Sequence, residues 1–119
     1  MMCSVNAATQ SDCSKKDNTL AIVDCHNQRY VVADKNLNKI YSAAMKNLTE
    51  VQKSKLRDSQ RAWIKFRDAD FDLVVEMNAD SGSYANVAIS DFKAAFVENR
   101  VKELKEMFTG PGDAPDWVK

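Results

Sequence analysis

The scarcity of helix-breaking residues constrains this chain more than any other feature of its sequence. Its 119 residues include only 3 glycines and 2 prolines, and both prolines lie close to the C-terminus. Because Gly and Pro are the residues that most often end helices and form turns, the body of the chain can form long helices. No segment of any length alternates apolar and polar residues as a strand does. The sequence therefore predicts an all-α fold.

The first helical segment begins at Asn18 or Thr19 and reaches about Leu48. Its apolar residues recur mainly at three- and four-residue steps, as they do on one face of a helix. A separate short helix over residues 19–26, with a bend near Asn27, is an alternative to one continuous helix.

Two further helices follow. Thr49 and Gln52 form a capping-box pattern, which predicts a second helix from residue 50 to about 77 or 78. Gly82 lies among Asn, Asp and Ser, which favours a turn. A third helix is expected over residues 85–108, and Gly110 followed by proline is typical of its end.

These segments predict a small antiparallel bundle of three main helices, with a short N-terminal helix or bend. We expect an irregular arm over residues 1–17, one helical domain over 18–109 and an irregular tail over 110–119. A chain of this length suffices for one domain with a modest core.

Charge and hydropathy exclude some classes of partner. Lysine and arginine together number 17, as do aspartate and glutamate, so net charge gives no reason to expect nucleic acid or an anionic membrane as partner. No apolar run approaches the roughly 18–20 residues needed to cross a bilayer, so we expect no membrane span.

The cysteines allow several interpretations. Cys13 and Cys25 are close enough in the chain to form a disulfide in an oxidising compartment, or they are two free cytosolic thiols. A zinc site that adds His26 is a third option, but it lacks a fourth ligand at familiar spacing. Cys3 could remain free, carry a lipid or join two chains.

The first ten residues, MMCSVNAATQ, have neither a basic start nor the apolar segment of a secretory signal. Either the protein is cytosolic, or its signal peptide has been removed and a start methionine added.

Polar side chains lie on the apolar faces of the expected helices. Gln60 and Arg67 share a face with Trp63, and Arg100 lies among apolar residues of the third helix. A buried arginine needs a partner, so we expect Arg67 to reach Asp34 or another acid of the first helix. Gln60 and Asn38 would bond to each other or to the backbone. The residues that we expect to specify the fold are Asp34, Asn38, Tyr41, Gln60, Trp63, Arg67 and Arg100.

No arrangement of side chains predicts catalysis. A catalytic site needs a nucleophile beside a base, or two carboxyl groups with different pKa values. Cys25 and His26 are neighbours, and adjacent side chains on a helix point in different directions. We therefore predict no catalytic residue, no metal site and no cofactor.

Taken in order, these features resemble a known family. They are Cys13 and Cys25, then DKNLNKIY over residues 34–41, then LRDSQRAWIKFRD over residues 56–68, a Gly-Ser loop and a last helix with Arg100. This order is similar to that of the LprI-type family of small bacterial envelope proteins, named after a lysozyme inhibitor lipoprotein. The resemblance covers roughly residues 13–108.

The resemblance implies a secreted or periplasmic helical domain, made with a signal peptide and without enzymatic chemistry. It also implies a disulfide between Cys13 and Cys25. Many family members carry a second cysteine pair, and Phe71 and Phe92 take those positions here. Our hypothesis is that the two rings pack together and replace the covalent link.

The function that we predict is binding of a protein partner, with a lysozyme-type muramidase as the leading candidate. An envelope interaction module, or a periplasmic immunity protein with another target, is the alternative. The candidate partner-binding loop is Asp80, Ser81, Gly82, Ser83 and Tyr84, whose hydroxyls can donate to carboxylates of an enzyme cleft. The sequence leaves the oligomeric state open.

Overall fold

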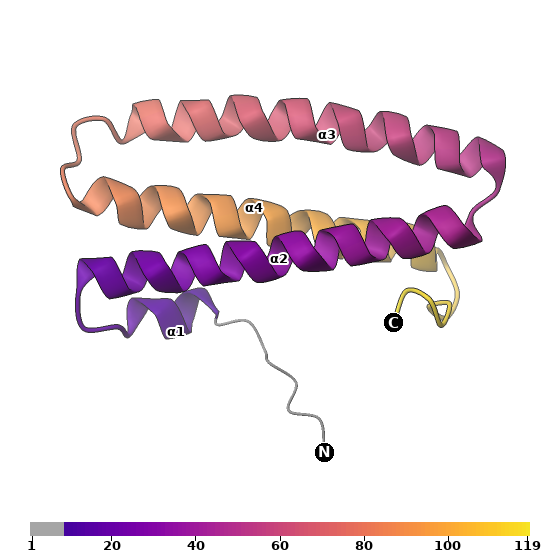
Figure 1. The fold of residues 1–119 in the computed structure, drawn as a ribbon, viewed down its shortest axis with the longest axis horizontal. Helices are drawn as coiled ribbons and strands as arrows, with labels where there is room; N and C mark the ends of the chain where they lie inside the picture. The colour runs from indigo at the N-terminus through magenta and orange to yellow at the C-terminus, as the bar shows by residue number, and fades with distance from the viewer. Residues whose placement is uncertain (1–8) are drawn as a thin grey trace, which may run out of the picture.

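The computed structural model describes residues 9–119, and for Ser11 it describes the backbone alone. These residues form four helices and no strand, which confirms the predicted all-α fold (Figure 1). The helices are α1 (Gln10–Ser14), α2 (Thr19–Asn47), α3 (Glu50–Met77) and α4 (Tyr84–Thr109). None of the described helices combines the length and the apolar character needed to cross a membrane. Cys3 lies outside the described residues.

In Figure 1, α2 and α4 run from left to right and α3 runs back from right to left, so α3 is antiparallel to both. The buried residues of α2 and α4 include the small side chains of Ala33, Ala44 and Ala94. Small side chains allow two helix axes to approach closely. In contrast, α3 contributes the large ring of Trp63 to the core. Helices α2 and α4 therefore lie closer to each other than to α3, and Figure 1 shows the α3 ribbon at a wider separation.

Helix α2 is continuous from Thr19 to Asn47, so the bend proposed near Asn27 is wrong. Asn27 is exposed in the middle of this helix, and an exposed asparagine costs an α-helix at most about 0.7 kcal/mol relative to alanine. Cys25 and Arg29, two residues before and two residues after Asn27, are both buried. Their packing outweighs the weak local preference of Asn27.

The ends of α3 and α4 follow the predicted signals. The hydroxyl of Thr49 accepts from the backbone N–H of Gln52, and the Gln52 side chain accepts from the backbone N–H of Thr49. Gly110 ends α4 with a φ of 61°, a conformation that glycine adopts without steric cost. Gly82, in the turn before α4, has the same φ.

Residues 10–14 form α1, where we predicted an irregular arm. The missed signal is a second capping box, because Thr9 accepts from the backbone N–H of Asp12 while the Asp12 carboxylate accepts from that of Thr9. These hydrogen bonds hold the pKa of Asp12 below its usual value. A five-residue helix has too few residues to show an apolar period.

The C-terminal residues return to the bundle after Gly110. Val118 is buried in the core, and the ring of Trp117 lies 5.2 Å from that of Phe108. The tail is irregular, as predicted, but it contributes to the core instead of leaving it.

Candidate functional site

A disulfide joins Cys13 on α1 to Cys25 on α2, with the two Cα atoms 5.4 Å apart. This bond is the one that the family resemblance implied, and it uses both thiols that a zinc site would need. A side-chain hydrogen bond from Gln10 to Asp91 also links α1 to α4. The short first helix is therefore held against both of its neighbours. Within residues 9–119, no group of three or more His, Cys, Asp or Glu side chains could hold a metal ion.

Next to the disulfide, Arg29 forms the most extensive polar contact of the fold. Its side chain is 3% exposed, and its guanidinium donates 2.8 Å to Asp91 and 3.2 Å to Glu98, both on α4. Burial alone would lower the pKa of Arg29, but the hydrogen bonds to Glu98 and Asp91 outweigh it and raise that pKa. This network locks the register of α2 against α4.

His26 completes the network. Its Nδ1 atom lies 2.8 Å from a guanidinium nitrogen of Arg29. Because a guanidinium can only donate, Nδ1 must be the unprotonated acceptor. Burial lowers the pKa of His26; Asp91, 3.9 Å away, opposes this effect, and Arg29 adds to it. The ring is therefore neutral and acts as a structural acceptor.

Sequence reasoning missed this network, although a signal was present. Arg29 lies four residues after Cys25 and four before Ala33, so all three share one helical face. Asp91 and Glu98 lie seven residues apart, which also places them on one face of α4.

The second buried arginine, Arg100, joins α4 to α3. It donates 3.1 Å to Gln60 and 3.1 Å to Ser59, and it lies 5.7 Å from the centre of the Trp63 ring. Burial lowers the pKa of Arg100, and Glu103 at 3.5 Å partly offsets the shift. The structure thus brings together three of the residues that we expected to specify the fold, with Arg100 as the partner of Gln60. Of the two alternatives predicted for Gln60 and Asn38, a hydrogen bond between them is absent from the described part of the chain, because Gln60 accepts from Arg100 and Asn38 is exposed.

The predicted contact between Arg67 and an acid of the first helix is also wrong. Arg67 donates from Nε and Nη2 to its neighbour Asp68, and its guanidinium lies 5.5 Å from the Trp63 ring and 6.0 Å from that of Phe71. These rings come from one turn before and one turn after Arg67, so stacking along α3 offers a local alternative to an ion pair across the bundle. Asp34 is half-buried on α2.

An aromatic cluster fills the space between α3 and α4. The rings of Phe71 and Phe92 lie 6.3 Å apart in an edge-to-face arrangement. Phe96 contacts both rings and also those of Trp63 and Phe66, at 5.5 to 5.9 Å. Tyr41, on α2, is half-buried against the core. The proximity of Phe71 and Phe92 is what our hypothesis requires, but whether the pair replaces a covalent link stays a prediction.

The predicted binding loop forms the turn between α3 and α4. Residues 80–83 are exposed, and Tyr84 is the first residue of α4 rather than part of the loop. The turn is closed by its own backbone, because the N–H of Ser81 donates to Asn78 and that of Ala85 donates to Gly82. Its exposed side chains are therefore accessible to another molecule.

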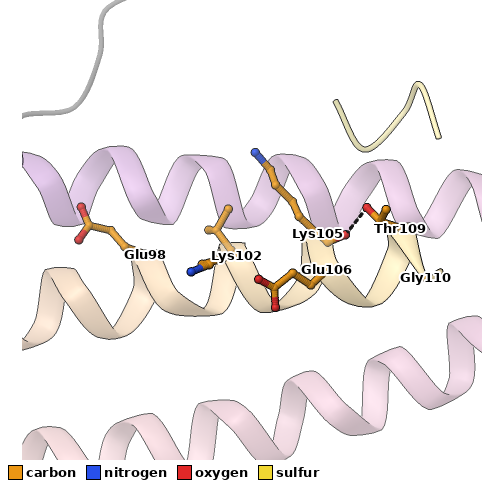
Figure 2. A pocket seen from close by; sticks show the side chains of 7 residues that line it. Glu98, Lys102, Lys105, Glu106, Thr109 and Gly110 are labelled. Atoms are coloured by element: carbon orange, nitrogen blue, oxygen red, sulfur yellow. Dashed lines mark hydrogen bonds between the residues drawn. The ribbon is translucent and has the colours of Figure 1, made fainter. Parts of the chain in front are cut away.

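A surface pocket of about 540 Å³ lies along α4 (Figure 2). Figure 2 shows the charged side chains of Glu98, Lys102, Lys105 and Glu106 spread along that helix. All of the lining residues are half-buried or exposed, and they belong to α4 and Gly110 alone. The pocket is open and carries both signs of charge. It lacks the converging polar groups of a small-molecule site.

Comparisons with known proteins give one family match and one relative. The family model described as Lysozyme inhibitor LprI matches residues 10–104. The chain is also similar to an uncharacterized protein of Rhizobium meliloti (strain 1021). The two are 32% identical over 111 residues, which cover 82% of this chain and 79% of the relative. No solved structure matches the chain at a significant level.

Proposed function

Because this chain belongs to the lysozyme inhibitor LprI family, we propose that it is a non-enzymatic protein that binds and blocks a lysozyme-type muramidase. The observation that carries this proposal is the family match, which spans most of the described chain, from residue 10 to residue 104. The disulfide supports a periplasmic or secreted location, since such bonds persist in oxidising compartments.

The turn between α3 and α4 is the contact site that we favour. Muramidases hydrolyse glycan between two carboxyl groups in a cleft. Ser81 and Ser83 lie in the turn that joins α3 to α4, and their exposed hydroxyls can donate to such carboxylates. Tyr84 is 67% exposed, and an exposed aromatic ring is a frequent anchor in protein interfaces.

A lysis assay tests the proposal. The oxidised protein is titrated against a basic animal-type lysozyme and a bacterial muramidase, with Tyr84→Ala and Ser83→Ala alongside. We expect stoichiometric inhibition by the wild type and an inhibition constant about 10-fold weaker for Tyr84→Ala. Removing one hydroxyl should weaken it about 3- to 10-fold.

Ser54→Ala is the matched control, because Ser54 is an exposed serine near the opposite end of α3. Inhibition that all three variants retain would keep the function and reject this contact site. No inhibition at a large molar excess would reject the muramidase as target and favour another envelope partner, such as a toxin neutralised by an immunity protein.

A further inference from the structure

The C-terminal half of α3 exposes apolar side chains on the side that faces away from the bundle. Leu73 is 59% exposed and Met77 is 74% exposed, and they lie four residues apart on the same side of the helix. Tyr84 begins the next helix just beyond the turn and is also exposed. Single exposed apolar residues are common, but Leu73 and Met77 are neighbours on the helix surface, and adjacent exposed apolar side chains can form part of an interaction surface.

Carboxylates accompany these apolar side chains. Asp68, Asp72 and Glu76 follow one another at four-residue intervals, which places them in one row along α3, and Asp80 continues the acidic character into the turn. Residues 68–84 contain no lysine or arginine. Residues 53–67 of the same helix are basic, with one acid, Asp58, among Lys53, Lys55, Arg57, Arg61, Lys65 and Arg67. A chain with no net charge therefore has a strongly acidic end on one helix.

Most of this negative charge has no internal partner. None of the ion pairs in the described part of the chain involves Asp72, Glu76 or Asp80. The buried network is different, because both Asp91 and Glu98 meet Arg29. Unpaired carboxylates beside exposed apolar groups produce a local negative potential, which attracts a basic partner and orients it.

We infer that the outer side of the C-terminal half of α3, together with Tyr84, is a docking surface for a basic protein. We call the α3 part of this surface the acidic face and define it by Asp72, Leu73, Glu76 and Met77. This inference rests on the proposed function and names its partner class, the basic animal-type lysozymes. Leu73, Met77 and Tyr84 contact apolar surface of the partner, while Asp72 and Glu76 meet its lysine and arginine side chains.

Binding kinetics of the full chain with a basic animal-type lysozyme test the inference. The double variant Asp72→Asn/Glu76→Gln should lower the association rate about 5- to 10-fold at low salt and flatten its salt dependence. The matched control, Asp113→Asn/Asp116→Asn, changes the net charge equally at two exposed carboxylates of the C-terminal tail. It should leave the rate nearly unchanged.

A second pair of variants tests the apolar contact. Met77→Ser should weaken affinity about 10-fold, mainly through faster dissociation. Met107→Ser is its control, since Met107 is a 56% exposed methionine near the end of α4. We expect this control to bind as the wild type does.

The outcomes separate this inference from the proposed function. A wild type that inhibits lysozyme, with variants of the acidic face equal to their controls, would keep the function and overturn the docking surface. A wild type that binds no lysozyme would overturn both. Self-association in sedimentation experiments that Met77→Ser abolishes would assign the surface to a second copy of the chain and also overturn the inference.

Discussion

Two regions of the molecule differ in whether their carboxylates have ion-pair partners. One is the side of the bundle formed by α1, α2 and α4, and the other is the outer side of α3. On the first side, Arg29 is almost completely buried and has two carboxylate partners, Asp91 and Glu98. On the outer side of α3, the carboxylates of Asp72 and Glu76 are exposed and have no ion-pair partner among the described residues. The same chemical group therefore stabilises the fold where the chain supplies its counter-ion, and remains available to a partner where it does not.

The inner side of α3 is intermediate between these two. Its buried contacts use rings and guanidinium groups, with Trp63 between Arg67 and Arg100. Loss of one of these contacts leaves no carboxylate without a counter-ion, whereas loss of Arg29 does so for Asp91 and Glu98. We expect the α2–α4 interface to be the more sensitive to mutation.

The largest expected effect is that of Arg29→Met. This change leaves Asp91 and Glu98 without a counter-ion in partly buried positions, and it should lower the free energy of unfolding by about 3 kcal/mol. Urea denaturation measures the loss. Arg61→Met is the control, because Arg61 and Asp58 are exposed and should contribute less than about 0.5 kcal/mol. If both variants lost the same free energy of unfolding, the two sides would not differ in how much their ion pairs stabilise the fold.

Loss of the disulfide ranks second. Cys13→Ser/Cys25→Ser opens a loop with a sequence separation of 12, which should cost about 2–3 kcal/mol. Hydrogen exchange should show faster exchange in α1 and unchanged exchange in the turn at residues 78–83, because the disulfide lies at α1 and α2. Faster exchange in both places would show that α3 depends on the disulfide as well.

The Phe71 and Phe92 rings should contribute less. A double-mutant cycle with Phe71→Leu and Phe92→Leu should give a coupling energy of about 0.5–1.5 kcal/mol for an edge-to-face pair. A coupling near zero would show that the two rings do not replace a covalent link. Phe66→Leu with Phe92→Leu is the comparison, since each of those rings contacts Phe96 and we expect no direct coupling between them.

The smallest effect concerns pH, because protonation of His26 disturbs one of several contacts of Arg29. The pKa of His26 is lowered in the folded protein, so the unfolded chain binds the proton more tightly. The contribution is complete above the unfolded pKa of 6.5 and is lost as the pH falls through that value toward the folded pKa. The charged groups that face the ring are Arg29 on α2 and Asp91 and Glu98 on α4.

Urea midpoints at about pH 7.5 and pH 5.0 test this effect, with His26→Gln as the comparison. A glutamine side chain at this position would keep an acceptor for Arg29 and does not titrate, so the variant should lose less stability on acidification than the wild type. An identical loss in both proteins would assign the pH dependence to other groups.

Much of the fold could be predicted from the sequence. The ends of α3 and α4 were predicted within one residue, because Thr49, Gln52 and Gly110 act through hydrogen bonds and backbone conformations that depend on their immediate neighbours. The same local reasoning failed at Asn27, where packing of the surrounding helix outweighed a weak preference. It failed again at α1, whose short capping box was not recognised.

Less of the candidate site could be predicted from the sequence. The exposed turn at residues 80–83 was predicted, since Gly82 and its polar neighbours mark a turn by their own conformational preferences. The partners of the polar side chains were not, because an apolar period identifies the side of a helix that is buried but not the residue that it meets on another helix.

The sequence by itself determined where the three long helices begin and end, and that one of them has a basic half and an acidic half. Only the tertiary structure decided which charges neutralise one another. Arg29 finds Asp91 and Glu98 because α2 and α4 approach closely through small side chains, whereas α3 presents Asp72 and Glu76 to solvent. Coulombic interactions depend on the distance between side chains that lie far apart in the chain, and the packing of the helices sets that distance.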